Sequence, residues 1–318
     1  MSTLHPQVAA LLEAAKNSKI PPLHTVSAVE ARRIYRETRG KLLPPAPQMA
    51  LCEDVSIPGP AGKIAVRHYR PAGSAAVQKL SALVFYHGGG WVIGDLDTHD
   101  VLCRELSNGA GCAVFAIDYR MGPEHPFPAA VEDSIAAARH FSERAADYAI
   151  DATRMAVGGD SAGGNLAAVV AIAMRDAGGP RLAYQLLIYP ATDQRMRHPS
   201  HRANGTGYLL TRELIEYFRG HYLPDGKHYE DWRASPLLAK DLSGLPPAYV
   251  LTAGFDPLVD EGREYADRLA AAGVKVEYQC YADMVHGFII MGGVLDTARV
   301  AVADCAARLK RAFDTRVG

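Results

Sequence analysis

The sequence predicts an α/β protein in which a mostly parallel central sheet is flanked by helices. Short apolar runs alternate with helical patterns along most of the chain. Several of these runs are continuously apolar, as expected for strands whose two faces are both covered by helices. With 318 residues, of which 48% are hydrophobic and 22% charged, the chain is also long and apolar enough to bury a large core.

The alternating series begins near residue 64 and continues to the end of the chain. We expect strands at 64–69, 82–86, 113–117, 155–157, 185–189, 248–252 and 276–281. Helical patterns fall between most of them, at 98–109, 129–145, 162–177, 259–272 and 297–314. The alternation predicts a doubly wound sheet with helices on both faces.

The N-terminal segment lies outside this series and predicts two short helices. The first has apolar residues along one face and ends before Pro21. The second opens at Ser27, which stands three residues before Glu30 with the spacing of a capping box. Gly40 is expected to end it.

The stretch between Pro190 and Pro236 also interrupts the series. It predicts a helix around 214–218, after a loop that is rich in basic residues: Arg195, Arg197, His198, His201 and Arg202. An insertion after a sheet strand lies at the carboxyl ends of the strands, over the site that such sheets carry there. We expect the basic loop to be a solvated surface and not an anion site, because neither a glycine nest nor a helix start accompanies it.

A Gly-Asp-Ser-Ala-Gly motif around Ser161 stands between a predicted strand and a predicted helix. Side chains two positions before and after the serine would collide in so tight a turn, and both positions, Gly159 and Gly163, are glycine. This spacing is typical of a nucleophile elbow, so Ser161 is the candidate nucleophile. The alternative is a glycine-rich turn that caps an ordinary helix.

A second glycine-rich motif, His-Gly-Gly-Gly-Trp, follows the predicted strand 82–86 and begins at His87. We expect the amides of Gly88 and Gly89, together with that of Ala162, to form an oxyanion hole. A flexible turn or a phosphate-cradling loop is the alternative, but the phosphate reading is disfavoured because neither glycine signature for phosphate binding occurs here. His87 itself is expected to be structural.

These motifs resemble the hormone-sensitive-lipase-like branch of the α/β-hydrolase superfamily. The resemblance rests on residues 87–91, 118–129, 158–165, 256–258 and 286–288, which occur in the family's order. One departure is Met121-Gly122, where the family usually reads Leu-Ala; it touches no catalytic position. The resemblance implies an α/β-hydrolase fold with a helical cap formed by 1–45 and 190–235, and a catalytic core formed by 46–189 and 236–318.

In this fold the acid and the histidine of the triad follow the serine in that order. Asp256 is the first carboxylate after the predicted strand 248–252, and Asp260 and Glu261, one helical turn later, compete with it. Their other role would be to complement a helix dipole. His286, in the loop after the predicted strand 276–281, is the candidate base, since no other histidine follows His228. His125, in a Pro-Glu-His-Pro stretch, is expected to be structural.

The combination predicts a serine hydrolase that cleaves short- to medium-chain carboxylic esters through an acyl-enzyme, with no metal or organic cofactor. The cap residues Tyr208, Leu209 and Phe218, together with Trp91, are expected to bound the substrate pocket. An amidase, formamidase or lactonase on the same triad is an alternative. A ligand-binding receptor on this fold is a further alternative, which the presence of His286 disfavours.

Charge and cysteine content limit the partners of the chain. A formal net charge of −1 gives no electrostatic case for nucleic acid or an anionic membrane. The five cysteines are scattered without C-x-x-C spacing, which favours free thiols in a reducing compartment over a zinc site. No signal peptide or apolar stretch of about 18 residues is found, so we expect a cytoplasmic protein with no membrane insertion. The resemblance also suggests a homodimer through residues 274–309.

Overall fold

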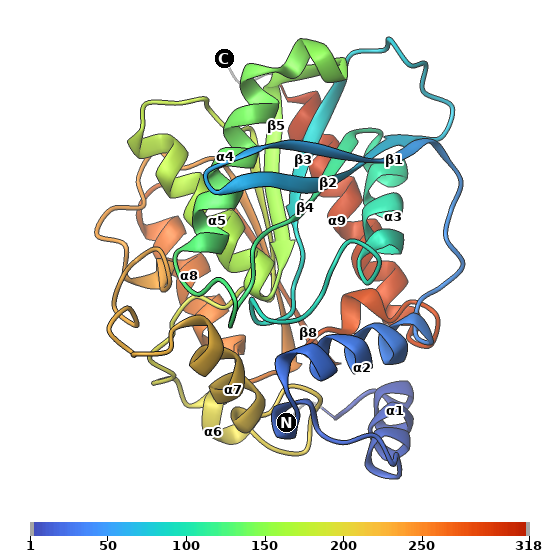
Figure 1. Ribbon diagram of the computed structural model, residues 1–318, viewed down its shortest axis with the longest axis vertical. Helices are drawn as coiled ribbons and strands as arrows, with labels where there is room; N and C mark the ends of the chain where they lie inside the picture. Colours follow the sequence, from blue (N-terminus) through green and yellow to red (C-terminus); the bar gives the residue numbers. More distant parts are fainter. Residues whose placement is uncertain (1–2, 316–318) are drawn as a thin grey trace.

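The computed structural model describes residues 3–315, which contain an eight-stranded sheet in the order β1-β2-β4-β3-β5-β6-β7-β8 (Figure 1). Strand β2 runs antiparallel to β1 and β4, whereas all pairs from β4 to β8 are parallel. The strands are β1 Met49–Gly59, β2 Gly62–Pro71, β3 Leu80–Tyr86, β4 Ala113–Asp118, β5 Ile150–Asp160, β6 Tyr184–Ile188, β7 Ala248–Phe255 and β8 Val276–Val285. The predicted fold class and the seven predicted strands are confirmed.

Strand β1 is the one that the sequence pattern did not predict. It lies at the edge of the sheet and, among residues 3–315, pairs only with β2, through a hairpin in which Gly59 faces Gly62. Most of its side chains are exposed or half-buried, and they include Glu53 and Asp54. Charged, half-exposed sequence of this kind is typical of edge strands, which avoid pairing with other chains, but it does not give the apolar run by which a strand is recognised.

Helices cover both faces of the sheet. On one face lie α3 (Asp100–Ala110) and α9 (Asp296–Asp314); on the other lie α4 (Ala129–Glu143), α5 (Ala162–Asp176) and α8 (Val259–Ala271) (Figure 1). The side chains of β3 alternate between these layers: Val84 packs in the core with α4, α5 and α8, and Phe85 packs in the core with α3 and α9. Because both faces are buried, the strand reads as one apolar run.

The remaining helices gather at one end of the molecule, at the bottom of Figure 1, beside the carboxyl ends of the parallel strands. They are α1 (Pro6–Lys16), α2 (Ala28–Gly40), α6 (Ser200–Ala203) and α7 (Arg212–Tyr222). Ser27 caps α2 by accepting a hydrogen bond from the Glu30 amide at 3.3 Å, as predicted. Single turns of 3₁₀ helix occur at Leu23–Thr25, Ala145–Tyr148, Pro236–Leu238 and Phe288–Ile290.

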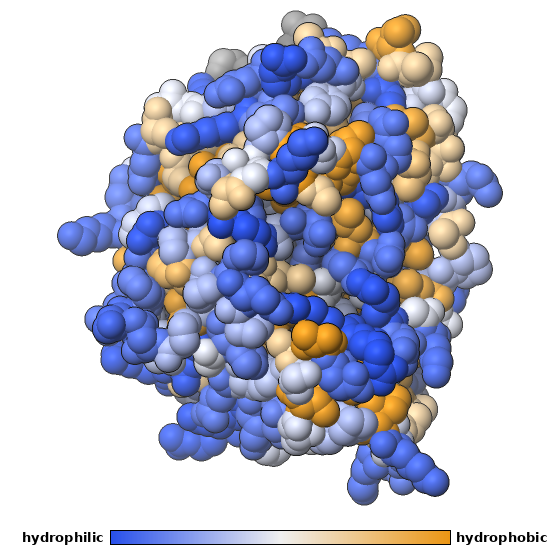
Figure 2. Space-filling model, viewed as in Figure 1, coloured by the Kyte–Doolittle hydropathy of each residue, from blue (hydrophilic) through white to orange (hydrophobic). Residues whose placement is uncertain are grey.

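The face seen in Figure 1 is largely hydrophilic, with hydrophobic side chains in small groups among charged ones (Figure 2). Within residues 3–315 no helix has the length and apolar character needed to cross a membrane. All five cysteines are free thiols, and Cys103, Cys112 and Cys305 are buried.

Candidate active site

Four parallel strands end at the same edge of the sheet, and the residue that follows each of them belongs to one of the motifs found in the sequence. Strand β3 leads into His87, β5 into Ser161, β7 into Asp256 and β8 into His286. Ligand sites of open α/β sheets form at the carboxyl ends of the strands, because the loops that follow converge there. The chain therefore brings together residues that are up to 199 positions apart in the sequence.

Ser161 occupies a sharp turn between β5 and α5, with φ 56° and ψ −115°. A positive φ is uncommon for a residue other than glycine, and such strained positions cluster at active sites. A Cβ on either Gly159 or Gly163 would collide with the carbonyl oxygen of Tyr86 in the neighbouring strand. The glycine spacing is thus explained by backbone packed against backbone around the serine.

His286 lies between the serine and a carboxylate. Its Nε2 is 2.9 Å from the Ser161 Oγ, and its Nδ1 is 2.7 Å from the Asp256 Oδ2. The Asp256 side chain is fully buried, whereas His286 and Ser161 are half-buried beside a cavity. The arrangement has the hydrogen-bond connectivity of a serine, a base and an acid that orients the base.

The turn after β7 holds Asp256 from several sides. Its Oδ1 accepts a hydrogen bond from the Leu258 amide at 2.8 Å. The side-chain amide of Asn204 donates to the carbonyl oxygens of Gly254 and Asp256, at 3.1 Å and 3.0 Å. Because Asn204 belongs to the insertion after β6, this insertion stabilises the turn after β7. Sequence reasoning had no signal for Asn204, because it lies 52 residues from its partner.

The two competing carboxylates face other partners. The Asp260 Oδ2 accepts a hydrogen bond from the Ser200 amide at 2.8 Å. Glu261 accepts from the Thr192 amide and lies 2.7 Å from the His201 Nε2. Of the three candidates, Asp256 is the one that contacts His286.

The glycine loop corrects one expected role. The Gly88 amide donates its hydrogen to the Asp160 Oδ1 at 2.8 Å, so it cannot also donate to an oxyanion. By contrast, within residues 3–315 the amides of Gly89, Gly90 and Ala162 donate to no other group. Gly89 has φ +126°, and a Cβ there would collide with the carbonyl oxygen of Ile93. The free donors are therefore shifted one residue along the loop from the expected pair.

His87 packs against the glycine loop that follows β3. It is buried, stacks on the Tyr119 ring at 4.4 Å between centroids, and its Nδ1 lies 2.8 Å from the Gly88 carbonyl oxygen. Burial, helped by the nearby His99, lowers the pKa of His87 to about 4, so the ring is neutral near pH 7. The contacts agree with the expected structural role. His125 is exposed on the surface.

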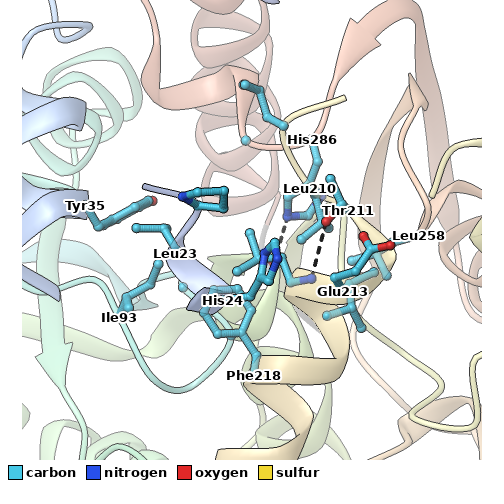
Figure 3. Close-up of a pocket in the computed structure, with 18 of the residues that line it drawn as sticks. Leu23, His24, Tyr35, Ile93, Leu210, Thr211, Glu213, Phe218, Leu258 and His286 are labelled. Carbon is cyan, nitrogen blue, oxygen red and sulfur yellow. Dashed lines mark hydrogen bonds between the residues drawn. The ribbon is translucent and has the colours of Figure 1, made fainter. Parts of the chain in front are cut away.

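A cavity of about 750 Å³ is lined by Ser161 and His286 on the side of the core and by residues of the helices at this end of the molecule. Figure 3 shows His286 and Phe218 at this cavity. Trp91, Leu209 and Phe218 line it, and their expected contact with substrate stays a prediction. Tyr208 does not line the cavity, because its ring packs against Phe255, with 5.1 Å between the ring centroids. The prediction that Tyr208 bounds the pocket is therefore wrong. Residues 11–42 supply much of the remaining wall, which sequence reasoning placed in the cap without naming single side chains.

The basic loop after β6 is only partly the solvated surface that was expected. His201 is 2% exposed and lies against Glu261, and Arg195 forms an ion pair with the buried Asp193 at 2.8 Å. Arg197 is exposed. The loop is attached to the core by hydrogen bonds to α8, in which Asp260, Glu261 and Glu264 contact the Ser200 amide and the rings of His201 and His198, respectively.

Comparison with known proteins agrees with this geometry. A family model described as an alpha/beta hydrolase fold matches residues 83–290. The chain is 46% identical over 295 residues to the carboxylic ester hydrolase LipN of Mycobacterium tuberculosis, covering 91% of this chain and 77% of LipN. It is 39% identical to an ethyl acetate hydrolase of Pseudomonas putida, covering 93% of this chain and 95% of that one.

A solved structure gives the same result. The ester hydrolase EH1AB1 from the metagenome of Lake Arreo, complexed with a derivative of bipyridine phosphonate, superimposes with a TM-score of 0.95. Its sequence identity to this chain is 45%, and the match covers 98% of this chain and 100% of the other. Likeness at this level extends over the core and over the helices at the cavity.

Proposed function

The chain belongs to the α/β-hydrolase family, in its hormone-sensitive-lipase-like branch, and from that premise we propose that Ser161, His286 and Asp256 form the catalytic triad of a carboxylesterase. That the enzyme is a carboxylesterase follows from relatives 39–46% identical over most of the chain. The observation that carries the assignment of the residues is the placement of His286 between Ser161 and Asp256, at 2.9 Å and 2.7 Å.

The proposed reaction begins with attack of the Ser161 Oγ on the acyl carbonyl. The Nδ1–H of His286 donates to Asp256, which leaves Nε2 free to accept the serine proton. Asp256 stabilises the imidazolium that forms, and the imidazolium then protonates the leaving alkoxide. Water resolves the acyl-enzyme by the same steps in reverse order, with His286 again as the base.

We propose that the amides of Gly89, Gly90 and Ala162 hold the oxyanion of the tetrahedral intermediate. Their hydrogens are free of other acceptors within the described residues, and Gly89 and Gly90 line the cavity together with Ser161. Preorganised backbone donors stabilise the developing charge without reorganisation during the reaction, which is commonly the largest single contribution to catalysis. Gly88 supports them through its hydrogen bond to Asp160.

We also propose a preference for short- and medium-chain acyl groups, and cap boundaries at 1–45 and 190–235. Leu209, Phe218 and residues of the first 45 positions line the cavity together with Ser161. Each methylene that fits contributes about 0.8 kcal/mol, and each further one must displace packed side chains. Activity should therefore rise over the first few carbons and then fall.

The test is kcat/KM on 4-nitrophenyl esters from acetate to palmitate. A maximum at palmitate, or activation at an oil–water interface, would contradict the proposed acyl preference. A parallel panel of amides, formamides and lactones with matched acyl groups separates the ester from its alternatives, because all of them use the same triad. Higher kcat/KM on one of these classes would replace the ester as the preferred substrate.

A homodimer through the edge of the sheet is a further part of the proposal. Strand β8 pairs only with β7, so within residues 3–315 its other edge meets no strand. An open edge offers backbone groups to a second copy of the chain. Sedimentation at several concentrations tests the homodimer, and a concentration-independent monomer would exclude it.

A cytoplasmic location, supported by the free thiols, is tested by cell fractionation.

A further inference from the structure

A second cavity lies at the opposite end of the sheet from Ser161, where the parallel strands β6, β7 and β8 begin (Figure 1). We call it the distal cavity; its volume is about 670 Å³. Its walls come from the starts of these strands, the loop between α5 and β6, and the last turns of α9. A concave space of this size is in the range of small-molecule sites. The proposed ester reaction gives it no role.

One wall of the distal cavity is apolar. Met174 of α5, Leu182 before β6 and Leu245 before β7 line it, and all three side chains are buried in the core. Ala312 of α9 adds a small, half-buried side chain. An apolar ligand group gains free energy when it leaves water for such a wall.

Two buried donors at the distal cavity lack an acceptor. Tyr184, the first residue of β6, is 5% exposed, and its hydroxyl has no hydrogen-bond partner within residues 3–315. The buried Nε of Arg308 lies 3.2 Å from a Glu277 oxygen but forms no hydrogen bond in the same part of the chain. Burial raises the pKa of Tyr184 above its usual value, so its hydroxyl keeps its proton. Buried polar atoms are nearly always satisfied, so an acceptor is missing here.

The charged side chains that line the distal cavity are mostly cationic. Glu277 is the one acidic side chain among them, and the cations are Arg175, Arg181, Lys275, Arg308 and Arg311. Three of these cations pair with carboxylates. Arg181 and Lys275, which are exposed, form no ion pair among the described residues. Their charge favours an anion at the mouth of the cavity.

We propose that the distal cavity binds a carboxylate with an apolar chain of medium length. The carboxylate supplies the acceptor that the Tyr184 hydroxyl lacks, and the charges of Arg181 and Lys275 attract it. The chain lies against the apolar wall. The ligand joins the end of α9 to the starts of β6 and β8, so its binding stabilises the folded chain. The site takes no part in the ester reaction.

Titration calorimetry with octanoate on the full-length protein tests the proposal. Octanoate should bind and should raise the Tm in proportion to its concentration. Acetate, which lacks the chain, and octan-1-ol, which lacks the charge, should each bind at least about 10-fold more weakly, because one half of the recognition is missing. Labelling of Ser161 with a serine-directed phosphonate should leave octanoate binding unchanged.

Tyr184→Phe assigns the binding to the bare hydroxyl. It should weaken octanoate binding by at least about 10-fold, as expected for a hydrogen bond to a charged group. Without octanoate its Tm should not fall, because the hydroxyl that it removes has no partner in the described residues. Tyr222→Phe is the matched control: its hydroxyl is also buried and bare, but Tyr222 does not line the distal cavity.

Lys275→Gln tests the charge at the mouth. It should weaken octanoate binding by about 3- to 5-fold, the usual size of an exposed charge interaction. Lys310→Gln is the matched control, since Lys310 is exposed on α9 and lies outside the distal cavity. It should bind octanoate as the parent does.

The opposite results overturn the proposal. Absence of octanoate binding, or equal affinity in the parent and in Tyr184→Phe, would show that the distal cavity does not hold the acid. Binding that is lost on labelling of Ser161 would place the acid in the active-site cavity. A dimer that Lys275→Gln disrupts and octanoate does not would make the cavity an interface between copies of the chain. Failure of the phosphonate to label Ser161 would contradict the proposed nucleophile and not this site.

Discussion

The two sides of the cavity are built in different ways. On the core side, the groups next to Ser161 belong to turns in which even a Cβ finds no space, as at Gly89, Gly159 and Gly163. On the side of the expected cap, the wall is made of side chains from helices in which few residues are buried. Helix α1 buries only Val8 of its 11 residues, whereas α5 buries most of its 15.

We expect this difference to separate the chemistry of the reaction from the choice of substrate. Turns that are packed backbone against backbone leave little room for other arrangements, so we expect the proposed oxyanion donors and the Ser161 hydroxyl to be held in place before the substrate arrives. Helices with few buried apolar contacts open at lower free energy and tolerate exchange of side chains. Substitutions on the core side should therefore abolish the reaction, and substitutions on the cap side should change which ester reacts.

The most severe test of the core side is Ser161→Ala. Removing the nucleophile should reduce kcat by about 10⁶-fold, as loss of a triad serine does elsewhere. The measurement is turnover of 4-nitrophenyl butyrate, together with mass spectrometry after labelling of the parent with a serine-directed phosphonate. A label on a different serine would move the nucleophile out of the elbow.

Asp256→Asn should reduce kcat by about 10⁴-fold, because the amide would hold His286 in the wrong tautomer while keeping the geometry. Asp260→Asn is the matched control, since Asp260 bonds to the Ser200 amide and does not contact His286. It should leave kcat within a few-fold of the parent. A larger loss of kcat in Asp260→Asn than in Asp256→Asn would assign the role of the acid to Asp260, one helical turn further along the chain.

Gly89→Val should reduce kcat by about 100- to 1,000-fold, the usual cost of losing one oxyanion donor. The residue has φ +126° and its Cβ would meet the Ile93 carbonyl, so the loop must move. Gly40→Ala is the control, because a Cβ at Gly40 meets nothing within 4 Å. A folded Gly89→Val protein with parental kcat would show that this loop does not hold the oxyanion.

The support beneath the loop should appear in the pH dependence of stability. The pKa of His87 is about 4 in the folded protein, against about 6.5 for an ordinary histidine in the unfolded chain. The unfolded state therefore binds more protons between these values. The contribution, about 3 kcal/mol, is fully present above pH 6.5 and is lost as the pH falls towards 4.

Urea unfolding at several pH values between 4 and 7 measures this contribution. His87→Gln should remove this part of the pH dependence, whereas His125→Gln, at an exposed position, should retain it. If the free energy of unfolding of His87→Gln depends on pH as that of the parent does, another group titrates in this range.

The smallest effect is expected on the cap side. Phe218→Ala enlarges the cavity that the ring lines, so the preferred acyl chain should lengthen by one or more carbons while kcat on the best ester changes by a few-fold. Tyr208→Ala is the control, because the Tyr208 ring packs on Phe255 outside the cavity. Equal shifts in both variants would show that the cap acts through its stability and not through its wall.

The sequence by itself determined the parts of this protein that depend on local backbone geometry. The apolar runs predicted seven of the eight strands, and the spacing of Gly159 and Gly163 predicted the turn at Ser161, because short-range sterics leave glycine as the residue that fits there. The order of Ser161, Asp256 and His286 along the chain predicted three residues that the fold brings within hydrogen-bond distance.

Tertiary structure alone decided where hydrogen bonds and side chains point across long sequence separations. Asp160 takes the Gly88 amide and shifts the free donors to Gly89 and Gly90; Tyr208 turns away from the cavity onto Phe255. The meeting of His201 with Glu261 depends equally on how the insertion packs against α8. Each of these choices is a competition among partners that only the packed chain brings within reach, so no local pattern records its outcome.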